Sequence, residues 1–457
     1  MLERQILVSL SFLFLLFPLI SKRSILSMPK KKQDFNPLDL DSFSCKADHW
    51  ANQHNYFCSL HSSRSTIPYG SFPRIIAVGA NTVLAPQVAN NFKALEQYLR
   101  YNKDWLFGHF SYDLKNETEN LTSENKSQVI FPQMTFFRPD HLIHFNTSTI
   151  TIESEEEPGD IYNQIRNFPL PLASELESHQ LRADTTETQY MDTVEKLRKH
   201  IEEGDIYEIN YCINFYAKYE HIDPVYLFHK LTELSPNPFS AFYKLGEKYA
   251  LCASPERFIK KIKHKIVSQP IKGTAPRGSS DPNDLVLKNN LQSSEKERAE
   301  NMMIVDLVRN DLARSCLAGS VKVEEMFGIY TFPQLHQMIS TISGELRDDK
   351  TPVDAIKNAF PMGSMTGAPK IKVMELIERY EQTARGLFSG SIGYFKPDND
   401  FDFNVMIRSL FLDAKKQKLS FSVGSAITFD SDPAEEYAEC KLKAKAIKSL
   451  ITAKNNN

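Results

Sequence analysis

A lysine between two prolines is the residue of this chain best placed for covalent chemistry. Lys272 lies in the segment from Pro270 to Pro276 (PIKGTAP), which Arg277 and Gly278 follow. A free lysine amine has a pKa of about 10.4, so only about one molecule in a few thousand carries the neutral, nucleophilic amine at pH 7. Burial would have to lower this pKa before the lysine could act as a nucleophile. The segment alone leaves open an ordinary lysine in a solvated turn.

Two pairs of glutamates have a spacing that suits a divalent cation. Glu297 and Glu300 are three residues apart, as are Glu436 and Glu439. Residues three apart on a helix project from the same face, so each pair would present two carboxylates together. Oxygen ligands of this kind suit Mg²⁺, which keeps several waters and takes its other ligands from carboxylates and an anionic substrate. Taken alone, either pair is more typical of a solvated helical face.

Two helices are predicted to carry these pairs. Ser294 and Glu297 form a capping-box pattern ahead of apolar residues at helical spacing. Asp432 is expected to cap the second helix, which would begin at Pro433 and has lysines toward its far end, where the helix dipole favours positive charge.

The composition excludes some classes of function. The 457 residues carry a formal charge of -3, which offers no basic face for nucleic acid. The six cysteines form neither a CxxC pair nor a Cys/His metal pattern, which is typical of reduced thiols in a cytoplasmic enzyme. An apolar run before residue 21 falls short of the roughly 20 residues that span a bilayer, and Pro18 interrupts it. We therefore expect residues 1–27 to be a leader outside the fold, and no membrane partner.

Strand-like runs, for example residues 389–395 and 419–423, recur along the chain between helical patterns. The acidic, proline-bearing run at 153–158 looks like a solvated connection. It predicts an N-terminal lobe of residues 28–175 and a catalytic region of residues 176–457.

From about residue 185 to 450 the chain resembles the family of chorismate-utilising enzymes. The matching segments are, in chain order, residues 254–258 (SPERF), 270–274 (PIKGT), 306–312 (DLVRNDL), 363–370 (GSMTGAPK) and 430–433 (DSDP). The resemblance implies an α+β fold in which two large, mainly antiparallel sheets pack face to face with helices outside. The PIKGT segment is similar to that of the branch that makes aminodeoxychorismate, whereas relatives that make anthranilate usually have alanine in place of the lysine.

The resemblance also implies a reaction, the conversion of chorismate and ammonia to 4-amino-4-deoxychorismate on the route to folate and 4-aminobenzoate. Lys272 would add to ring carbon 2 while Glu256 protonates the hydroxyl that leaves carbon 4. Ammonia would then enter at carbon 4 and expel the lysine, so that two allylic displacements replace one hard substitution. Glu256 needs a raised pKa for this role; an ion pair with Arg257 is the alternative. Since the chain has no Gly-x-Cys-x-Gly elbow, ammonia from glutamine would require a separate amidotransferase subunit.

The family's substrate and metal contacts map onto further positions. The guanidinium of Arg408 would bind both oxygens of one substrate carboxylate, with Tyr394 as its neighbour. Pairing of Arg408 with a structural acid is the alternative. His336 would line the ring pocket or be a satisfied core histidine. The glutamates that would hold Mg²⁺ against the ring carboxylate are Glu297, Glu300, Glu436 and Glu439. The other expected substrate contacts are Ser364, Thr366, Thr274, Gly424 and Ser425.

Two positions near the expected site depart from the family pattern. Glu208 occupies the place where ammonia-adding relatives usually have glutamine and water-adding isochorismate and salicylate enzymes have lysine. Ala426 lies in a segment that is commonly richer in glycine, and a positive φ there would cost on the order of 1 kcal/mol. Three alternatives therefore stay open: an anthranilate synthase component I, which Lys272 opposes; an isochorismate synthase, which Glu208 opposes; and a catalytically weakened regulatory paralogue.

Overall fold

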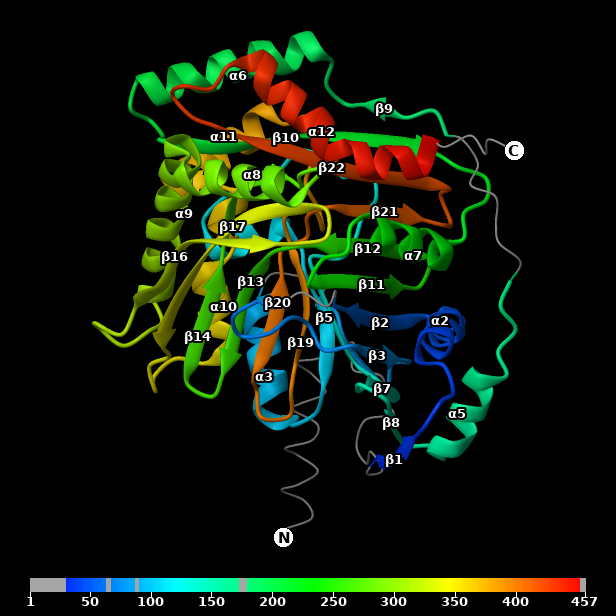
Figure 1. The fold of residues 1–457 in the computed structure, drawn as a ribbon. Coiled ribbons are helices and arrows are strands. Elements are labelled where there is room, and N and C mark those ends of the chain that lie inside the picture. The colour runs from blue at the N-terminus through cyan, green and yellow to red at the C-terminus, as the bar shows by residue number, and fades with distance from the viewer. Residues whose placement is uncertain (1–29, 63–66, 87–89, 172–178, 453–457) are drawn as a thin grey trace.

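Two antiparallel β-sheets form the centre of the fold (Figure 1). The computed structural model describes residues 30–62, 67–86, 90–171 and 179–452. The 12-stranded sheet contains, in spatial order, β1 (Lys31–Phe35), β8 (Ile150–Ser154), β7 (His141–Phe145), β3 (Ile75–Val78), β2 (Tyr56–His61), β11 (Phe239–Leu245), β12 (Lys248–Ser254), β21 (Ser409–Asp413), β22 (Lys418–Ile427), β10 (Glu208–Lys218) and β18 (Gly367–Ala368), with β9 (Arg182–Ala183) also paired to β10.

The second sheet has ten strands. It contains, in spatial order, β15 (Ile271–Pro276), β17 (Leu335–Glu345), β14 (Lys265–Gln269), β13 (Arg257–Ile262), β20 (Phe401–Asn404), β19 (Ser391–Phe395), β5 (Leu106–Phe110), β6 (Met134–Arg138) and β4 (Thr82–Leu84), with β16 (Lys322–Thr331) also paired to β17. Strands from before and after residue 175 pair in both sheets, β2 with β11 in one and β5 with β19 in the other.

Helices cover the outer faces of the sheets. The 12-stranded sheet is covered by α2 (Leu40–Ala51), α5 (Pro158–Arg166), α6 (Glu187–Glu202), α7 (Pro224–Leu234), α11 (Lys370–Tyr380) and α12 (Pro433–Thr452). The ten-stranded sheet packs against α3 (Asn91–Tyr101), α9 (Glu295–Ala313) and α10 (Pro352–Ala359), and α8 (Asp281–Ser293) contacts β15. The remaining short helical segments are η1 (Tyr112–Leu114), α4 (Lys115–Thr118) and η2 (Gly363–Met365). Figure 1 shows α6 and α12 across the β10–β22 end of the first sheet.

Alternation of side chains along the strands explains the layering. On β12, Ala250 and Cys252 lie in the core between the sheets, whereas Leu251 and Ala253 lie in the core beneath the helices. Successive side chains of a strand point to opposite faces, so a sheet buried on both faces needs apolar residues at consecutive positions. The expected fold of two large antiparallel sheets packed face to face with helices outside is confirmed.

The predicted N-terminal starts of the two glutamate-bearing helices are also confirmed. The Ser294 hydroxyl accepts a hydrogen bond from the Glu297 backbone N–H at 3.4 Å, and α9 begins at Glu295, directly after Ser294. Asp432 Oδ1 accepts bonds from the N–H groups of Ala434 and Glu435 at 2.9 and 3.0 Å, and α12 begins at Pro433. Among the contacts of the described residues the reciprocal capping-box bond from the Glu297 side chain is not made.

Other local predictions are refined by the structure. The acidic run expected to connect two lobes is shorter than predicted, because β8 extends to Ser154 and α5 begins at Pro158.

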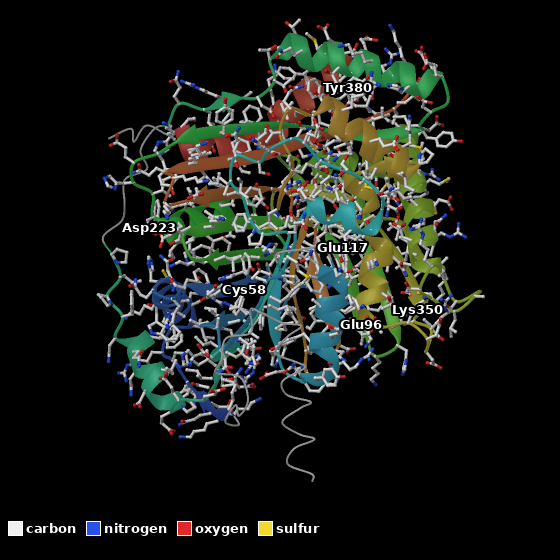
Figure 2. The ribbon with its side chains drawn as sticks, turned by 180° about the vertical axis from the view of Figure 1, so that it is seen from behind. Cys58, Glu96, Glu117, Asp223, Lys350 and Tyr380 are labelled. Atoms are coloured by element: carbon white, nitrogen blue, oxygen red, sulfur yellow. The ribbon has the colours of Figure 1, made fainter. Side chains whose placement is uncertain are left out.

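Glu117, labelled in Figure 2, accepts hydrogen bonds from the N–H groups of Asn91 and Phe92 at 2.9 and 3.1 Å and caps α3. No helix in the described ranges has the length and apolarity needed to cross a bilayer, and the leader expected at residues 1–27 lies outside those ranges.

Candidate active site

A lysine and a glutamate join the two sheets. Lys272 extends from β15 at the edge of the ten-stranded sheet, and Glu208 is the first residue of β10 in the 12-stranded sheet. Lys272 Nζ donates a hydrogen bond to Glu208 Oε1 at 2.5 Å, and the two side chains are only 10% and 1% exposed. The other oxygen, Glu208 Oε2, is buried and has no hydrogen-bond partner among the described residues. Residues 64 positions apart thus form one buried ion pair.

A bulge in β15 presents this lysine. The pairing with β17 gains one residue on β15 between Ile271 and Thr274. Gly273, inside the bulge, has a φ of 89°, a left-handed conformation that glycine adopts without the steric penalty of a side chain. A Cβ there would lie 3.0 Å from Glu297 Oε2, so glycine also allows α9 to approach the strand closely. The bulge therefore brings Lys272 beside the acidic face of α9.

The charges around Lys272 keep it protonated. Burial lowers the pKa of the Lys272 ammonium, but the carboxylates of Glu208 and Glu300 more than offset this effect, and the pKa lies above its ordinary value. The burial that would be needed to lower this pKa is present, but it comes with adjacent negative charges that outweigh it. Lys272 needs a proton acceptor before it can act as a nucleophile.

Glu256 has the pKa that an acid catalyst needs at neutral pH. Its carboxyl group lies between β12 and β13, is 3% exposed and accepts a hydrogen bond from the Ser364 hydroxyl at 2.6 Å. Burial raises the pKa of Glu256 to about 7, although the Ser364 hydrogen bond and the charge of Lys272 partly oppose the rise. The alternative of an ion pair with Arg257 is not realised, since that guanidinium binds Asp402 at 2.9 Å. Glu256 and Ser364 line the same cavity.

The turn that carries Ser364 is held by contacts that sequence reasoning missed. Arg385 donates hydrogen bonds to the carbonyl oxygens of Asn210 on β10 and Met365 on η2, at 2.7 and 2.5 Å. Glu381 binds Arg385 at 2.6 Å and accepts a bond from the Cys212 N–H at 3.0 Å. These bonds hold the strand of Glu208 against the turn of Ser364. Glu381 follows the end of α11, so its four-residue spacing from Arg385 gave no helical signal.

Arg408 is a cation without a counter-ion. It lies between β20 and β21 with a φ of 50°, and the residue is half-buried. No hydrogen bond or ion pair of its side chain occurs among the described residues, so the alternative of a structural acid is not realised. Burial lowers the pKa of Arg408 to about 10. Its backbone carbonyl accepts a bond from the Ala253 N–H at 3.1 Å, which ties it to the strand that leads to Glu256. An anionic ligand would supply the missing charge.

The four candidate metal ligands meet where α9 approaches α12. Lys296 Nζ lies 3.7 Å from Glu436 Oε1, and Lys443 Nζ lies 2.5 Å from Glu439 Oε1. Burial raises the pKa of Glu300 to about 7. Burial, and then the charge of Glu439, raise the pKa of Glu297. Burial also acts to raise the pKa of Glu439, but the charge of Lys443 more than offsets it and the pKa lies below its usual value.

This cluster fits a hydrated cation rather than a closed metal cage. Within the described ranges no three of the four glutamates bring oxygen atoms within 4.8 Å of one another. Magnesium commonly keeps several waters and uses only one or two carboxylates, together with an anionic substrate. The oxygen-only donors and the raised pKa of Glu300 are compatible with such an ion.

The side chains of two expected substrate contacts are engaged by other residues of the protein. His336 Nδ1 lies 2.9 Å from Thr331 Oγ1 and its Nε2 lies 3.0 Å from Asp284 Oδ1, so the alternative of a satisfied core histidine describes it. Tyr394 packs against the rings of Trp105 and two phenylalanines in the core. Among the described residues no hydrogen bond or cation–ring contact joins Tyr394 to Arg408.

The hydroxyls of two further expected contacts are directed elsewhere. Thr366 Oγ1 donates to the Met362 carbonyl at 3.1 Å within its own turn, and Ser425 Oγ lies 2.8 Å from the Tyr190 hydroxyl beneath α6. Thr274, by contrast, is exposed on β15.

The segment of Ser425 is unstrained. A Cβ on Gly424 would lie 2.8 Å from the Tyr211 carbonyl, so glycine is required there for strand packing. Ala426 lies in the extended strand β22 and is not among the residues with positive φ. The strain considered for Ala426 is therefore absent.

The comparisons with known proteins agree with this fold. The model of the family described as "chorismate binding enzyme" matches residues 57–449, and the chain belongs to this family of enzymes that use chorismate. The aminodeoxychorismate synthase of Streptomyces griseus is 40% identical over 264 residues, which are 57% of this chain and 36% of that protein. The chain thus spans little more than a third of that relative's length.

Two further matches cover most of both chains. The aminodeoxychorismate synthase component 1 of Bacillus subtilis is 32% identical over 360 residues, which are 75% of this chain and 76% of that protein. The crystal structure of anthranilate synthase component I from Streptococcus pneumoniae superposes with a TM-score of 0.72 at 22% identity, over 94% of this chain and 95% of that chain. The latter likeness establishes the shared fold.

Proposed function

We propose that this chain is an aminodeoxychorismate synthase component I, which converts chorismate and ammonia to 4-amino-4-deoxychorismate. The observation that carries the proposal is the presence of two groups in one site: the largely buried Lys272, and Glu256, a separate carboxyl group whose pKa burial raises to about 7. A nucleophile and an acid on different strands are what a displacement with a poor leaving group requires. The names of the Streptomyces and Bacillus relatives support the same reaction.

In the proposed first step, the neutral amine of Lys272 forms a bond to ring carbon 2 of chorismate. Both ring double bonds shift as the bond between carbon 4 and its hydroxyl breaks. Glu256 donates its proton to this hydroxyl, which leaves as water. Its pKa of about 7 leaves a large fraction of Glu256 protonated at neutral pH. Ammonia then bonds to carbon 4, both double bonds shift back, and Lys272 departs as the leaving group.

The two carboxylates of chorismate need separate partners. The guanidinium of the half-buried Arg408 has no counter-ion among the described residues and suits the side-chain carboxylate. Glu297, Glu300, Glu436 and Glu439 would hold Mg²⁺. When bound, this ion would supply positive charge to the ring carboxylate.

The ammonia would come from a separate glutamine amidotransferase subunit. The Bacillus relative is named as a component 1, which supports a two-component enzyme. Reduced thiols fit the cytoplasm as the place of action, and the described residues contain six free cysteines.

The product formed with ammonium tests the proposal. The purified chain is incubated with chorismate, Mg²⁺ and ammonium, and the product is identified by mass. The expected product has an amino group in place of the hydroxyl and keeps the enolpyruvyl side chain. Anthranilate, which has lost that side chain as pyruvate, or isochorismate, which contains no nitrogen, would contradict the proposal. Glu256→Gln is expected to lower the rate by about 100-fold or more, because an amide cannot donate the required proton.

A further inference from the structure

Lys272 and Glu208 form an ion pair whose carboxylate retains an unused oxygen. Glu208 Oε1 accepts the bond from Lys272 Nζ at 2.5 Å, while Oε2 is buried without a hydrogen-bond partner among the described residues. We propose that Glu208 is a catalytic base that removes a proton from Lys272 and so produces the amine that attacks chorismate. This inference rests on the proposed function, because it supplies the step that makes Lys272 a nucleophile.

The position of Glu208 is fixed by its backbone. Glu208 pairs with Ala368 on β18, and the next residue, Ile209, pairs with Ile427 on β22 and Gly367 on β18. The N–H of Tyr207 adds a hydrogen bond to the Ala368 carbonyl at 2.7 Å. With the strand held from both sides, the carboxylate stays within reach of Lys272 without a movement of the main chain. A base must lie within hydrogen-bond distance of the proton that it removes, and Glu208 meets this condition.

No other described group is as well suited to take this proton. Glu208 is the only hydrogen-bond or ion-pair partner of Lys272 Nζ in the described ranges. Glu256 must carry a proton of its own to release the leaving hydroxyl. Neither Lys272 nor Glu208 forms a hydrogen bond or ion pair with the four candidate metal ligands among the described contacts. The charged groups that influence Lys272 are Glu208, Glu300 and Glu256, with weaker effects that link it to Glu297 and Glu439.

The proton balance closes over the two displacements. Glu208 takes a proton from the Lys272 ammonium, and the resulting amine forms its bond to carbon 2 while Glu256 protonates the departing hydroxyl. The adduct nitrogen then carries a positive charge. When ammonia bonds to carbon 4, Lys272 leaves as a neutral amine and recovers the proton from Glu208. The new ammonium group at carbon 4 returns a proton to Glu256. The sum is chorismate plus ammonia giving aminodeoxychorismate plus water.

A counter-ion without a catalytic role would give the opposite result when replaced. The amide of Glu208→Gln can accept the same hydrogen bond from Lys272 but cannot take its proton. If Glu208 only stabilised the ammonium, this variant would lower the pKa of Lys272, increase the fraction of neutral amine and accelerate adduct formation. If Glu208 is the base, the same variant slows adduct formation. The sign of the change therefore separates the two roles.

The experiment measures adduct formation without ammonia. Wild type and Glu208→Gln are mixed with chorismate and Mg²⁺, quenched at intervals between pH 6.5 and 9.5, and analysed by intact-protein mass spectrometry with mapping to Lys272. We expect the variant to be about 100-fold slower or more at pH 7, within the usual range for base catalysis. Relative to wild type, its rate should then rise about tenfold per pH unit as bulk solvent deprotonates the lysine, because both proteins lose the acid form of Glu256 alike.

Matched variants control for the loss of an ion pair. Asp400 binds Lys261 Nζ at 2.8 Å in a similarly buried pair, with side chains 13% and 10% exposed. Asp400→Asn should leave the adduct rate unchanged. Glu208→Asp keeps the carboxylate but shortens its reach, and should give a rate between those of wild type and Glu208→Gln.

Each outcome has a defined meaning. A Glu208→Gln rate equal to or faster than wild type would overturn the inference and leave the proposed function standing. Absence of any Lys272 adduct in the wild type would overturn the inference and the lysine step of the proposed function, whose overall reaction is tested separately by the product formed with ammonium. If thermal unfolding shows that Glu208→Gln does not fold, Glu208→Asp decides: a slower rate supports the base, and an unchanged rate rejects it.

Discussion

Replacing Ser364 with alanine should move the pH dependence of the reaction to higher pH. The Ser364 hydroxyl donates a hydrogen bond of 2.6 Å to Glu256 Oε1 and lowers the pKa of that carboxyl. Burial is the larger effect and raises the same pKa to about 7. Without the hydroxyl, burial is less opposed, so the pKa should rise further. Glu256 would then remain protonated, and able to donate its proton, at pH values where the wild-type residue is ionised.

The size of this shift follows from the strength of one hydrogen bond. A hydrogen bond to a charged group contributes about 1.5–3 kcal/mol, and one to a neutral group about 0.5–1.5 kcal/mol. Their difference is about 1–1.5 kcal/mol, and one pKa unit corresponds to about 1.36 kcal/mol. The variant should therefore have a pKa for Glu256 of about 8. At pH 8 the protonated fraction would rise from about one tenth to about one half, a fivefold gain.

The assay follows the formation of the Lys272 adduct across pH without ammonia, each variant scaled to its own maximum rate. The rate is lost as pH rises through the pKa of Glu256, because the acid form is consumed. This alkaline limb should move up by about one pH unit in Ser364→Ala. Thr366→Val is the matched control, because its hydroxyl bonds to the Met362 carbonyl in the same turn and not to Glu256. A limb that stays in place or moves down would refute the reasoning.

Three further changes test the remaining parts of the site and the fold. Arg408→Ala should raise KM for chorismate by roughly 10- to 100-fold with little change in Tm, because the guanidinium has no partner among the described residues; an unchanged KM would contradict its role. Glu300→Gln should raise the Mg²⁺ concentration for half-maximal activity in a titration, and an identical titration curve would remove it from the metal site. Asp402→Ala should lower the free energy of unfolding in urea by about 3–5 kcal/mol, since it leaves Arg257 buried without its bond of 2.9 Å; a loss below 1 kcal/mol would contradict this.

The sheets and helix starts were predictable because they depend on local or repeating signals. Asp432 and Pro433 mark the start of α12 in any context that permits a helix, and the alternation of β12 reflects burial on both faces. The resemblance to known enzymes supplied the arrangement of the sheets, which composition does not encode. Whether an expected polar residue is free depends on contacts from distant segments. His336, for example, is engaged by Asp284, which lies 52 positions away.

The charge state of Lys272 shows why such contacts decide chemistry as well as structure. Burial alone would make it a better nucleophile, and the sequence indicated that burial would be needed. The fold instead places Glu208, which lies 64 positions away on the other sheet, at 2.5 Å from its Nζ. The same carboxylate that opposes deprotonation at rest is also an acceptor for the proton, so one residue can both hold the lysine in place and activate it. A glutamine at position 208 could perform only the first of these tasks, which gives this departure from the family pattern a chemical meaning.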